Sequence, residues 1–508
     1  MFAGQDANRT ADAIALQIEP IGVSMPSSEV PVAGVEQFSP RDADFVYNES
    51  DGHPGHLLAV YLFDTDRQPA ELSQSAAVEW VAARLGHNRM FTHRIRRVPL
   101  GLAHPFWEPV ANLDLNQHVR VRAISEPGWV PVQQHLDALL TSRMDLTRPP
   151  WELHILTGIT GMDGQSGRRT AVVLKTHHSA GDGLAVLQLA EKIFSDKAAP
   201  ANPVPATRFL RGRMFARSVL GLPGALRRFA KDVPGNRAAV REVNEAAESG
   251  QWVEAVEQPA TRFNGKVTGF GSLSPVTLPA SGVRRIRAAA PDATANDVLL
   301  AVIGGALARY LAEKGEPHQG SLVAMVPRSM RKIEEWESAN QLAIMGVDMH
   351  TGITDPLERV ALIALSSKSE KTRTSHIAVR RQAAAMETAP PPLLRLMAYS
   401  RKKSTPDPSR PRHQHTMVSN MPFSIEGFTL NGAPAVAVIG AQPPVDGDQL
   451  RHFVVTTADG SLMLTVIADK ATMPDLDHYL ELIRASLAEL EDAADARTNQ
   501  DPSDEMAS

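Results

Sequence analysis

The chain has 508 residues, of which 43% are hydrophobic and 21% charged, and its formal net charge is −5. Because domains average about 150 residues, two or three domains are expected, and the near balance of charge gives no sign of nucleic acid as the main partner. The sequence contains no cysteine. This excludes disulfides, thiolate nucleophiles and cysteine-based metal sites, and it suits a reducing, cytoplasmic compartment.

The N-terminal residues 1–37 are rich in small and turn-forming residues, which is typical of a disordered lead-in. No basic start followed by an apolar stretch occurs there, so no secretory signal is expected. The apolar run at 298–308 is much shorter than the roughly 20 residues that a membrane span requires. These features indicate a protein that is soluble or bound to a membrane at its surface.

Ordered structure is expected to begin at "SPRDADF", where Ser39 can cap a helix and Pro40 suits its first turn. Between residues 38 and 200 strand patterns alternate with helix patterns, which favours an α/β unit. Strands are expected at 56–64, 94–101, 116–124, 151–159 and 168–178, and helices at 71–85, 130–144 and 184–193.

A Pro/Ala-rich stretch leads into a basic linker, which we place at residues 201–275 and expect to be helical. Basic side chains interleave there with large apolar ones, at Arg208, Arg211, Arg213, Arg217, Arg227, Arg228 and Lys231. Such a segment can lie on an anionic membrane surface. It can also be a solvated crossover helix whose apolar side packs on the protein, and the two interpretations are compatible.

A second α/β unit is expected at residues 276–492. Its first long helix, at 293–315, could be capped by Thr294 or Asn296. Strands are expected at 321–331, 340–350, 415–423, 433–441, 450–458 and 461–469, and a long amphipathic helix at 474–494. The polar residues 493–508 are expected to form a disordered tail.

The stretch "THHSAGDG" is the main candidate for chemistry. Successive strand side chains point to opposite faces, so His177 and His178 cannot both face one pocket. A neutral imidazole can take a proton from a hydroxyl near neutral pH. Asp182 is placed to cap the next helix, and Gly183 leaves room for a backbone or a ligand. Taken alone, however, the stretch is more typical of a simple capped corner between a strand and a helix than of a reaction centre, because histidines are common and a four-residue spacing to an aspartate can occur by chance.

Other catalytic signatures are missing from the sequence. It has no His-Glu-x-x-His helix, no Gly-x-Ser-x-Gly elbow, and neither of the glycine-rich loops that bind dinucleotides or phosphates. No metal site is therefore expected. The chemistry that remains is direct transfer between two substrates by one base, without a covalent intermediate.

"HHSAGDG" resembles the His-His-x-x-x-Asp-Gly signature of CoA-dependent acyltransferases, and the chain is most similar to the bacterial wax ester synthase/diacylglycerol acyltransferase family. The signature is shared with peptide-synthetase condensation domains, so the order of other stretches carries the specificity. Over residues 38–490 these include "SPRDADF", "DLNQHVR", "MDLTRPPWELHIL", "ANDVLLAVIGGAL", "SANQLAIMGVDM" and "VSNMPF".

The resemblance implies an α/β (α+β) fold of two chloramphenicol-acetyltransferase-like domains, each a mixed sheet with helices, joined by a long crossover and with a tunnel between them. It implies an O-acyltransferase that uses acyl-CoA as co-substrate, needs no cofactor, and esterifies diacylglycerol or a long-chain fatty alcohol. In this mechanism His178 is the general base and CoA leaves as the thiol. His177, Asp182 and Gly183 support the catalytic loop.

The resemblance also suggests roles for residues outside the signature. Asn296 is expected to shape the site near the base, although it could simply cap its helix. Pro149 and Trp151 are expected to line the acceptor tunnel or to hold the fold. Asn340 and Asn420 are expected to contribute to substrate binding. The implied partners are acyl-CoA, the acceptor lipid, and a membrane or lipid-inclusion surface, without nucleic acid.

Several positions around the site depart from the family pattern. Ser179, Ala180 and Gly181 stand where larger apolar residues are usual, Pro150 replaces a leucine, and Ala339 replaces a glycine. Two alternative functions therefore stay open. One is an acyltransferase for another secondary alcohol, such as a polyketide-type lipid, and the other is a catalytically silent protein that binds lipid inclusions.

Overall fold

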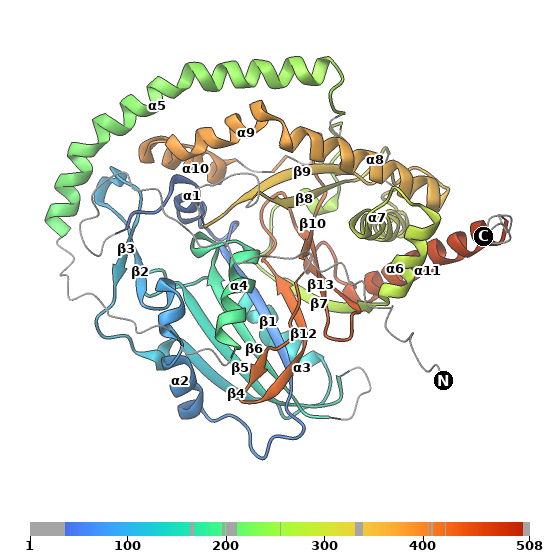
Figure 1. Ribbon diagram of the computed structural model, residues 1–508, viewed down its shortest axis with the longest axis horizontal. Coiled ribbons are helices and arrows are strands. Elements are labelled where there is room, and N and C mark those ends of the chain that lie inside the picture. The colour runs from blue at the N-terminus through green and yellow to red at the C-terminus, as the bar shows by residue number, and fades with distance from the viewer. Residues whose placement is uncertain are drawn as a thin grey trace, which may run out of the picture.

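The computed structural model describes residues 36–162, 167–195, 199, 211–253, 256–317, 319–330, 339–404, 406–407, 410–421 and 423–500. Its framework is a pair of six-stranded mixed sheets (Figure 1). The first sheet has the order β11 (Thr429–Leu430), β12 (Ala433–Ala441), β1 (His56–Asp64), β6 (Arg169–His177), β5 (Trp151–Ile159) and β4 (Val119–Ala123). The second has the order β7 (Gly271–Leu278), β14 (Leu462–Asp469), β13 (Leu450–Thr456), β10 (Thr416–Met421), β8 (Val323–Ser329) and β9 (Leu342–Asp348).

Helices and a small hairpin complete the two units. The N-terminal half carries α1 (Pro40–Asn48), α2 (Gln74–Ala82), α3 (Val130–Thr141), α4 (Gly183–Ile193) and the hairpin β2 (His93–Arg96) with β3 (Phe106–Pro109). The C-terminal half carries α6 (Ala280–Ala289), α7 (Ala295–Glu313), α8 (Pro356–Ser375), α9 (Ile377–Ala384), α10 (Pro391–Lys403) and α11 (Leu476–Gln500). Short 3₁₀ turns are η1 (Leu85–His87), η2 (Arg89–Phe91), η3 (Pro99–Gly101), η4 (Leu115–Gln117), η6 (His178–Ala180), η7 (Arg262–Asn264) and η8 (Ala385–Thr388).

Three apolar cores hold the fold together. One buries α7 between the second sheet and helices α6, α8 and α11. Another covers the outer face of the first sheet, under α2 and α4. The third lies between the two sheets, where Leu58 and Val173 of the first sheet share a cluster with Leu273, Phe453 and Ile467 of the second. Strands such as β1, with eight of nine residues buried, are apolar on both faces because both faces are covered.

The second unit is not self-contained. β12 lies in the C-terminal half of the chain but pairs antiparallel with β1 in the first sheet, with Val60 opposite Ile439. The domain expected at 276–492 therefore contributes strands to both sheets. This exchange could not be predicted, because a strand pattern does not specify the distant strand with which it pairs.

Two expected boundaries are also wrong. The second sheet begins at Gly271, inside the linker expected at 201–275. α11 continues to Gln500, so residues 493–500 are helical and not a disordered tail, and Ala494 in that part is buried. The expected lead-in at 1–35, residues 201–210 and the tail from 501 lie outside the described residues.

α7 begins at a capping box, in which Thr294 is the N-cap and exchanges hydrogen bonds with Asp297. It is long and apolar enough, by composition, to cross a membrane, yet 72% of its most apolar window is buried inside the protein. Its apolar surface is thus used in the core of the second unit.

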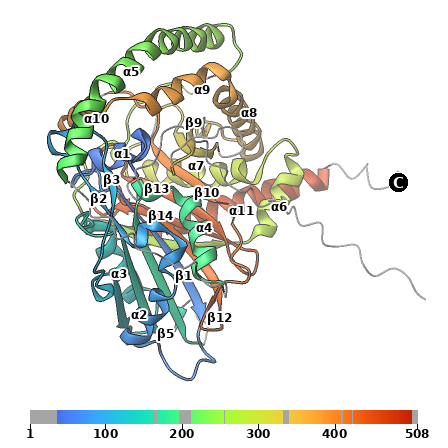
Figure 2. The same cartoon turned by 60° about the vertical axis from the view of Figure 1, so that its left-hand side comes forward.

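The linker contains α5 (Arg211–Glu248), a 38-residue helix with Pro223 and Pro234 inside it. Figures 1 and 2 show that it runs along the outside of the molecule, over α9. Its C-terminal half buries Ala239 and Ala246, and an ion pair of 3.7 Å joins Glu242 to Arg381 of α9. This half of α5 therefore matches the interpretation of the linker as a crossover helix that packs on the protein.

Candidate active site

The strand-to-helix corner forms as the sequence predicts. β6 ends at His177, a 3₁₀ turn over His178–Ala180 redirects the chain, and α4 begins at Gly183. Asp182 is the N-cap of α4, and its Oδ1 accepts a hydrogen bond of 2.9 Å from the Ala185 backbone N–H. The cap is fully buried, so the turn that carries the histidines is tied to the start of a helix.

His177 is buried and its ring is fully engaged. Nδ1 accepts from the Ser179 backbone N–H at 3.2 Å and lies 2.7 Å from the Ser179 hydroxyl. Nε2 therefore carries the proton and donates to Glu49 Oε2 at 3.2 Å. Ser179, which departs from the family pattern, supplies a partner that an apolar side chain could not. These contacts leave His177 a supporting role in the corner.

Glu49 connects this ring to the backbone of the catalytic loop. Its Oε2 also accepts from Gly55 N–H at 2.6 Å, and Gly55 C=O accepts from His178 N–H at 2.7 Å. Burial raises the pKa of Glu49, but hydrogen bonds and charge from His177, Gly55 and Arg143 outweigh burial and lower the pKa overall. Glu49 is thus held as a carboxylate.

Gly55 has no room for a side chain. A Cβ atom there would lie 2.5 Å from Glu49 Oε2 and 2.8 Å from His177 Nε2. The glycine is needed because the backbone passes directly against both groups.

His178 points away from His177 and lies partly exposed against α1. Its ring stacks on Phe45, with ring centroids 4.2 Å apart and planes 9° from parallel. Among the described residues Nδ1 has no hydrogen-bond partner of acceptable geometry and is buried, while the side chain as a whole is half-buried. Burial lowers the pKa of His178, and the charge of Asp182 and the Asn340 side chain offset this only in part. The ring is therefore neutral near neutral pH.

A segment from the C-terminal half fastens the loop from the other side. Asn340 Nδ2 donates to the His178 carbonyl at 2.9 Å and to Asp42 Oδ1 at 2.7 Å. The Gln341 backbone N–H donates to Asp182 Oδ2 at 3.1 Å. The structure thus places Asn340 at the catalytic loop, where its amide group holds protein atoms together.

Gly183 is closely approached, as the sequence suggests, and the neighbour is a methionine. A Cβ atom on Gly183 would lie 3.1 Å from Met421 Sδ, at the end of β10. Asn420 precedes Met421 on this strand, is half-buried, and pairs with Val454 of β13. Because neighbouring strand residues face opposite sides, the side chain of Asn420 points away from the Met421 contact.

Pro149 and Trp151 lie where β5 meets the catalytic strand. The carbonyl of Pro150 accepts from His177 N–H at 3.0 Å, and Pro149 is buried. Trp151 is 1% exposed, and its Nε1–H donates to the Phe91 carbonyl at 3.1 Å. These contacts give Trp151 a place in the core of the first unit.

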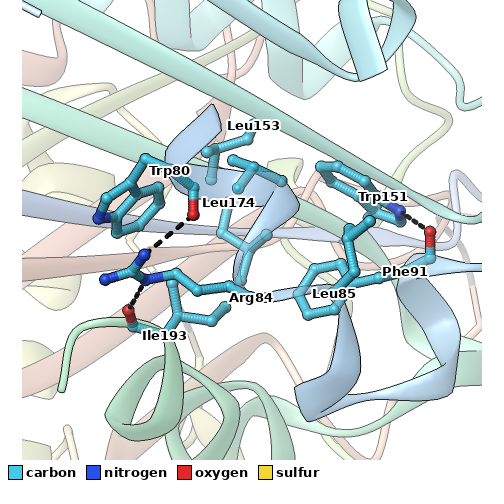
Figure 3. Close-up of a pocket in the computed structure, with 9 residues that line it drawn as sticks. Trp80, Arg84, Leu85, Phe91, Trp151, Leu153, Leu174 and Ile193 are labelled. Carbon is cyan, nitrogen blue, oxygen red and sulfur yellow. Dashed lines mark hydrogen bonds between the residues drawn. The ribbon is translucent and has the colours of Figure 1, made fainter. Parts of the chain in front are cut away.

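Trp151 also borders an apolar pocket beside the first sheet (Figure 3). At the other end of the pocket the Arg84 guanidinium lies over the Trp80 ring, 4.2 Å from its centroid, and donates to the Ile193 carbonyl at 2.7 Å. Leu174 of β6 lines the pocket, but none of residues 177–183 does. The pocket therefore lies upstream of the corner along the same strand.

Asn296 makes no hydrogen bond to the corner among the residues that the structure describes. It sits in the first turn of α7, half-buried, and its Oδ1 has no hydrogen-bond partner. The alternative interpretation of Asn296 as the helix cap is wrong, because Thr294 takes that position.

The arrangement supplies a half-buried, neutral imidazole on a loop that is held on several sides, as a general base requires. Sequence reasoning missed the residues that make the loop rigid, namely Asp42, Phe45, Glu49 and Gly55. The motif "SPRDADF" contains two of them, but only the tertiary contacts show their purpose.

Comparison with known proteins places this geometry in a family. A model of the wax ester synthase/diacylglycerol acyltransferase catalytic domain matches residues 38–299, and a model of the C-terminal domain of the same family matches residues 338–491. A Mycobacterium tuberculosis protein named as a diacylglycerol O-acyltransferase is 29% identical over 471 residues, covering 90% of this chain and 99% of the relative. A Mycobacterium bovis protein of the same name is 28% identical, covering 89% and 98%.

Solved structures share the fold. The wax ester synthase/diacylglycerol acyltransferase of Marinobacter aquaeolei aligns with a TM-score of 0.61 at 21% identity, covering 90% of this chain and 100% of that one. The first condensation domain of the CDA synthetase aligns with a TM-score of 0.55 at 13% identity, covering 91% and 97%. The expected α/β class, with mixed sheets and helices in an acyltransferase-type fold, is confirmed.

Proposed function

The chain belongs to the wax ester synthase/diacylglycerol acyltransferase family, and on this basis we propose that it moves an acyl group from acyl-CoA to diacylglycerol or to a long-chain fatty alcohol. Membership makes it an acyltransferase. The products would be triacylglycerol or wax ester. The observation that carries the proposal is the half-buried imidazole of His178 on a loop held by both halves of the chain.

The proposed reaction is a direct transfer. Nε2 of neutral His178 takes the proton of the acceptor hydroxyl while that oxygen attacks the thioester carbonyl carbon. The tetrahedral intermediate collapses with cleavage of the carbon–sulfur bond, and the imidazolium returns its proton to the CoA thiolate. Phe45 and the Asn340 contact keep the ring and the loop in place, so little reorganisation is needed during turnover.

Thiol release from a long-chain acyl-CoA tests this proposal. The purified full-length protein should release free thiol when diacylglycerol or hexadecanol is added, and His178→Ala should abolish the release. His413→Ala, at an exposed histidine paired with Glu257, is the matched control and should keep the wild-type rate. Unchanged release by His178→Ala would overturn the mechanism.

The same assay decides between the alternative functions. Turnover of another secondary alcohol, with none of diacylglycerol or hexadecanol, would indicate an acyltransferase for polyketide-type lipids. No release with any acceptor, together with binding to lipid inclusions, would indicate a silent binding protein. Asn296 stays a proposed site-shaping residue and Asn420 a proposed substrate contact until acceptor KM values are measured for their alanine variants.

We also propose that the protein attaches to the cytoplasmic surface of a membrane or of lipid inclusions through the N-terminal half of α5. Leu220 is 80% and Leu226 47% exposed there. Arg227 and Arg228 are exposed on the same half, Lys231 is exposed just beyond it, and anionic lipids attract such cations. The side chains of Arg211 and Arg213, which the sequence also suggested, lie outside the described residues.

Changing Arg227 and Arg228 to Gln should weaken binding to anionic vesicles, with the larger effect at low salt. Arg284→Gln, at an exposed position on α6, is the control for a lost surface charge. Equal vesicle binding by the double variant and the wild type would show that α5 is only a crossover.

A further inference from the structure

A second apolar surface lies on the outward side of α10 and on the neighbouring turn η3. Its four large side chains are Leu100, Leu396, Met397 and Tyr399, which are 81%, 64%, 44% and 60% exposed. We call these four residues the α10 surface. Single exposed apolar residues are ordinary, but an exposed group of them marks an interaction site.

The turn is held in a shape that presents Leu100 to solvent. Leu100 has φ 57°, a left-handed conformation that is unfavourable for a residue with a branched side chain. The next residue, Gly101, has φ 66° and lies so close to Arg395 of α10 that no Cβ would fit. A strained turn that exposes a leucine contributes nothing to the core, so it indicates a function outside the core.

Basic residues lie at the C-terminal end of the α10 surface. The last turn of α10 carries Arg401, Lys402 and Lys403, and Lys403 Nζ lies 5.8 Å from the centre of the Tyr399 ring. Tyrosine and lysine at the rim of an apolar patch are typical of the boundary between lipid headgroups and acyl chains. The chemistry of this surface therefore matches an anionic phospholipid layer.

The inner side of α10 packs on the helix that supports the base. Arg401 pairs with Asp44 of α1 at 2.5 Å, and Lys402 donates to the Glu49 carbonyl at 2.9 Å. Phe45 of the same helix stacks on the His178 ring. α10 therefore contacts α1 with its inner side, and α1 in turn contacts His178, the proposed base.

We infer that the α10 surface docks on an anionic phospholipid membrane and brings His178 close to the layer that contains the acceptor lipid. The inference rests on the proposed function for the identity of the acceptor. Figures 1 and 2 show α10 near the N-terminal end of α5, on the same side of the molecule. The basic residues of α5 would attract the protein to the anionic membrane over a distance, and the apolar side chains of the α10 surface would insert into the lipid layer.

The test is binding of the full chain to vesicles of phosphatidylglycerol and phosphatidylcholine, measured without acyl-CoA. The triple variant Leu100→Ser, Leu396→Ser and Tyr399→Ser should bind at least about tenfold more weakly, because three large apolar side chains are lost from the interface. Its deficit should persist at high salt, whereas the deficit of the α5 Gln variant should shrink. The control is Val253→Ser with Phe270→Ser, at residues that are 75% and 68% exposed elsewhere.

Thiol release with a short, water-soluble alcohol distinguishes a loss of membrane docking from a loss of catalytic activity, because this acceptor does not have to be reached at a membrane. The triple variant should retain that release while it loses release with vesicle-bound diacylglycerol. Wild-type vesicle binding by the triple variant would overturn the inference, as would an equal loss in the control. A changed elution volume on gel filtration with unchanged vesicle binding would show that the surface joins two copies of this chain.

Discussion

Glu49 is expected to be the residue on which the catalytic loop most depends, although it does not touch the reacting atoms. Its side chain is 2% exposed, and the carboxylate accepts three hydrogen bonds, from His177 Nε2, Gly55 N–H and Arg143. The first two reach the same oxygen, Oε2. Removing that oxygen would leave two buried donors without partners, and each unpaired buried donor costs about 1–3 kcal/mol.

Two substitutions separate the hydrogen bonds from the charge. Glu49→Ala should lower the free energy of unfolding by about 3–5 kcal/mol and abolish thiol release, because Gly55 and His178 are no longer held. Glu49→Gln can keep its oxygen toward both buried donors but turns its NH₂ group toward Arg143. Glu49→Gln should therefore lower the free energy of unfolding by about 2 kcal/mol, because its two hydrogen bonds then go to a neutral oxygen and not to a charged one. Part of the activity should be retained.

The pH dependence gives Glu49 a signature that simple packing would lack. The folded-state pKa of Glu49 is below its ordinary value of 4.5, so the unfolded chain binds more protons as the pH falls through that value. The stabilisation by Glu49 is therefore complete above pH 4.5 and is lost as the pH falls through the lowered folded-state pKa. The stability difference between wild type and Glu49→Gln should shrink over the same range.

Urea unfolding at several pH values, together with thiol release, measures these effects. Glu191→Gln, on the exposed side of α4, is the control and should stay within about 0.5 kcal/mol of wild type. Wild-type activity and stability in Glu49→Ala would refute the reasoning. So would a stability difference for Glu49→Gln that does not change with pH.

Four further predictions concern the same corner. The acid limb of the thiol-release rate should lie below pH 6.5, because burial lowers the pKa of His178 from that ordinary value and the base must be neutral; a limb above pH 6.5 would contradict this. Asp182→Asn should move the limb further toward acid, since the charge of Asp182 raises the pKa of His178. Gly55→Ala should cost at least about 2 kcal/mol in urea unfolding and abolish turnover, because its Cβ has no space. Trp151→Phe should cost about 1 kcal/mol for a lost hydrogen bond and leave the acceptor KM unchanged, whereas a raised KM at full stability would make Trp151 a substrate contact.

Local sequence patterns were sufficient for most secondary structure. The expected strands at 56–64, 151–159 and 433–441 match β1, β5 and β12 at both ends. Asp182 was recognised as a cap from its position before an apolar helix. Strand geometry was expected to separate the two histidines, but the strand ends at His177 and His178 lies in the 3₁₀ turn that follows. These features depend on atoms within a few residues of one another, which is the range over which sequence patterns are informative.

The helices between residues 356 and 403 were not predicted. α10 also shows why apolar residues at helical spacing do not by themselves identify the buried face of a helix. Its buried face consists of Pro391, Leu394 and Ala398, while Leu396 and Tyr399 face solvent. An apolar residue at helical spacing is usually a core residue. Which face is covered depends on the neighbouring elements, and so the α10 surface became visible only in the tertiary structure.

The sequence alone narrowed the chemistry, because it has no cysteine, no serine elbow and no metal motif, and its resemblance to the family indicated His178 as the candidate base. The tertiary structure decided how that base is held. Glu49 meets His177 across 128 residues, and Asn340 meets Asp42 across 298 residues. No local pattern specifies such pairs, because only the folded chain brings residues so far apart in the sequence next to one another. The candidate base could be read from the chain, but its surroundings exist only in the folded protein.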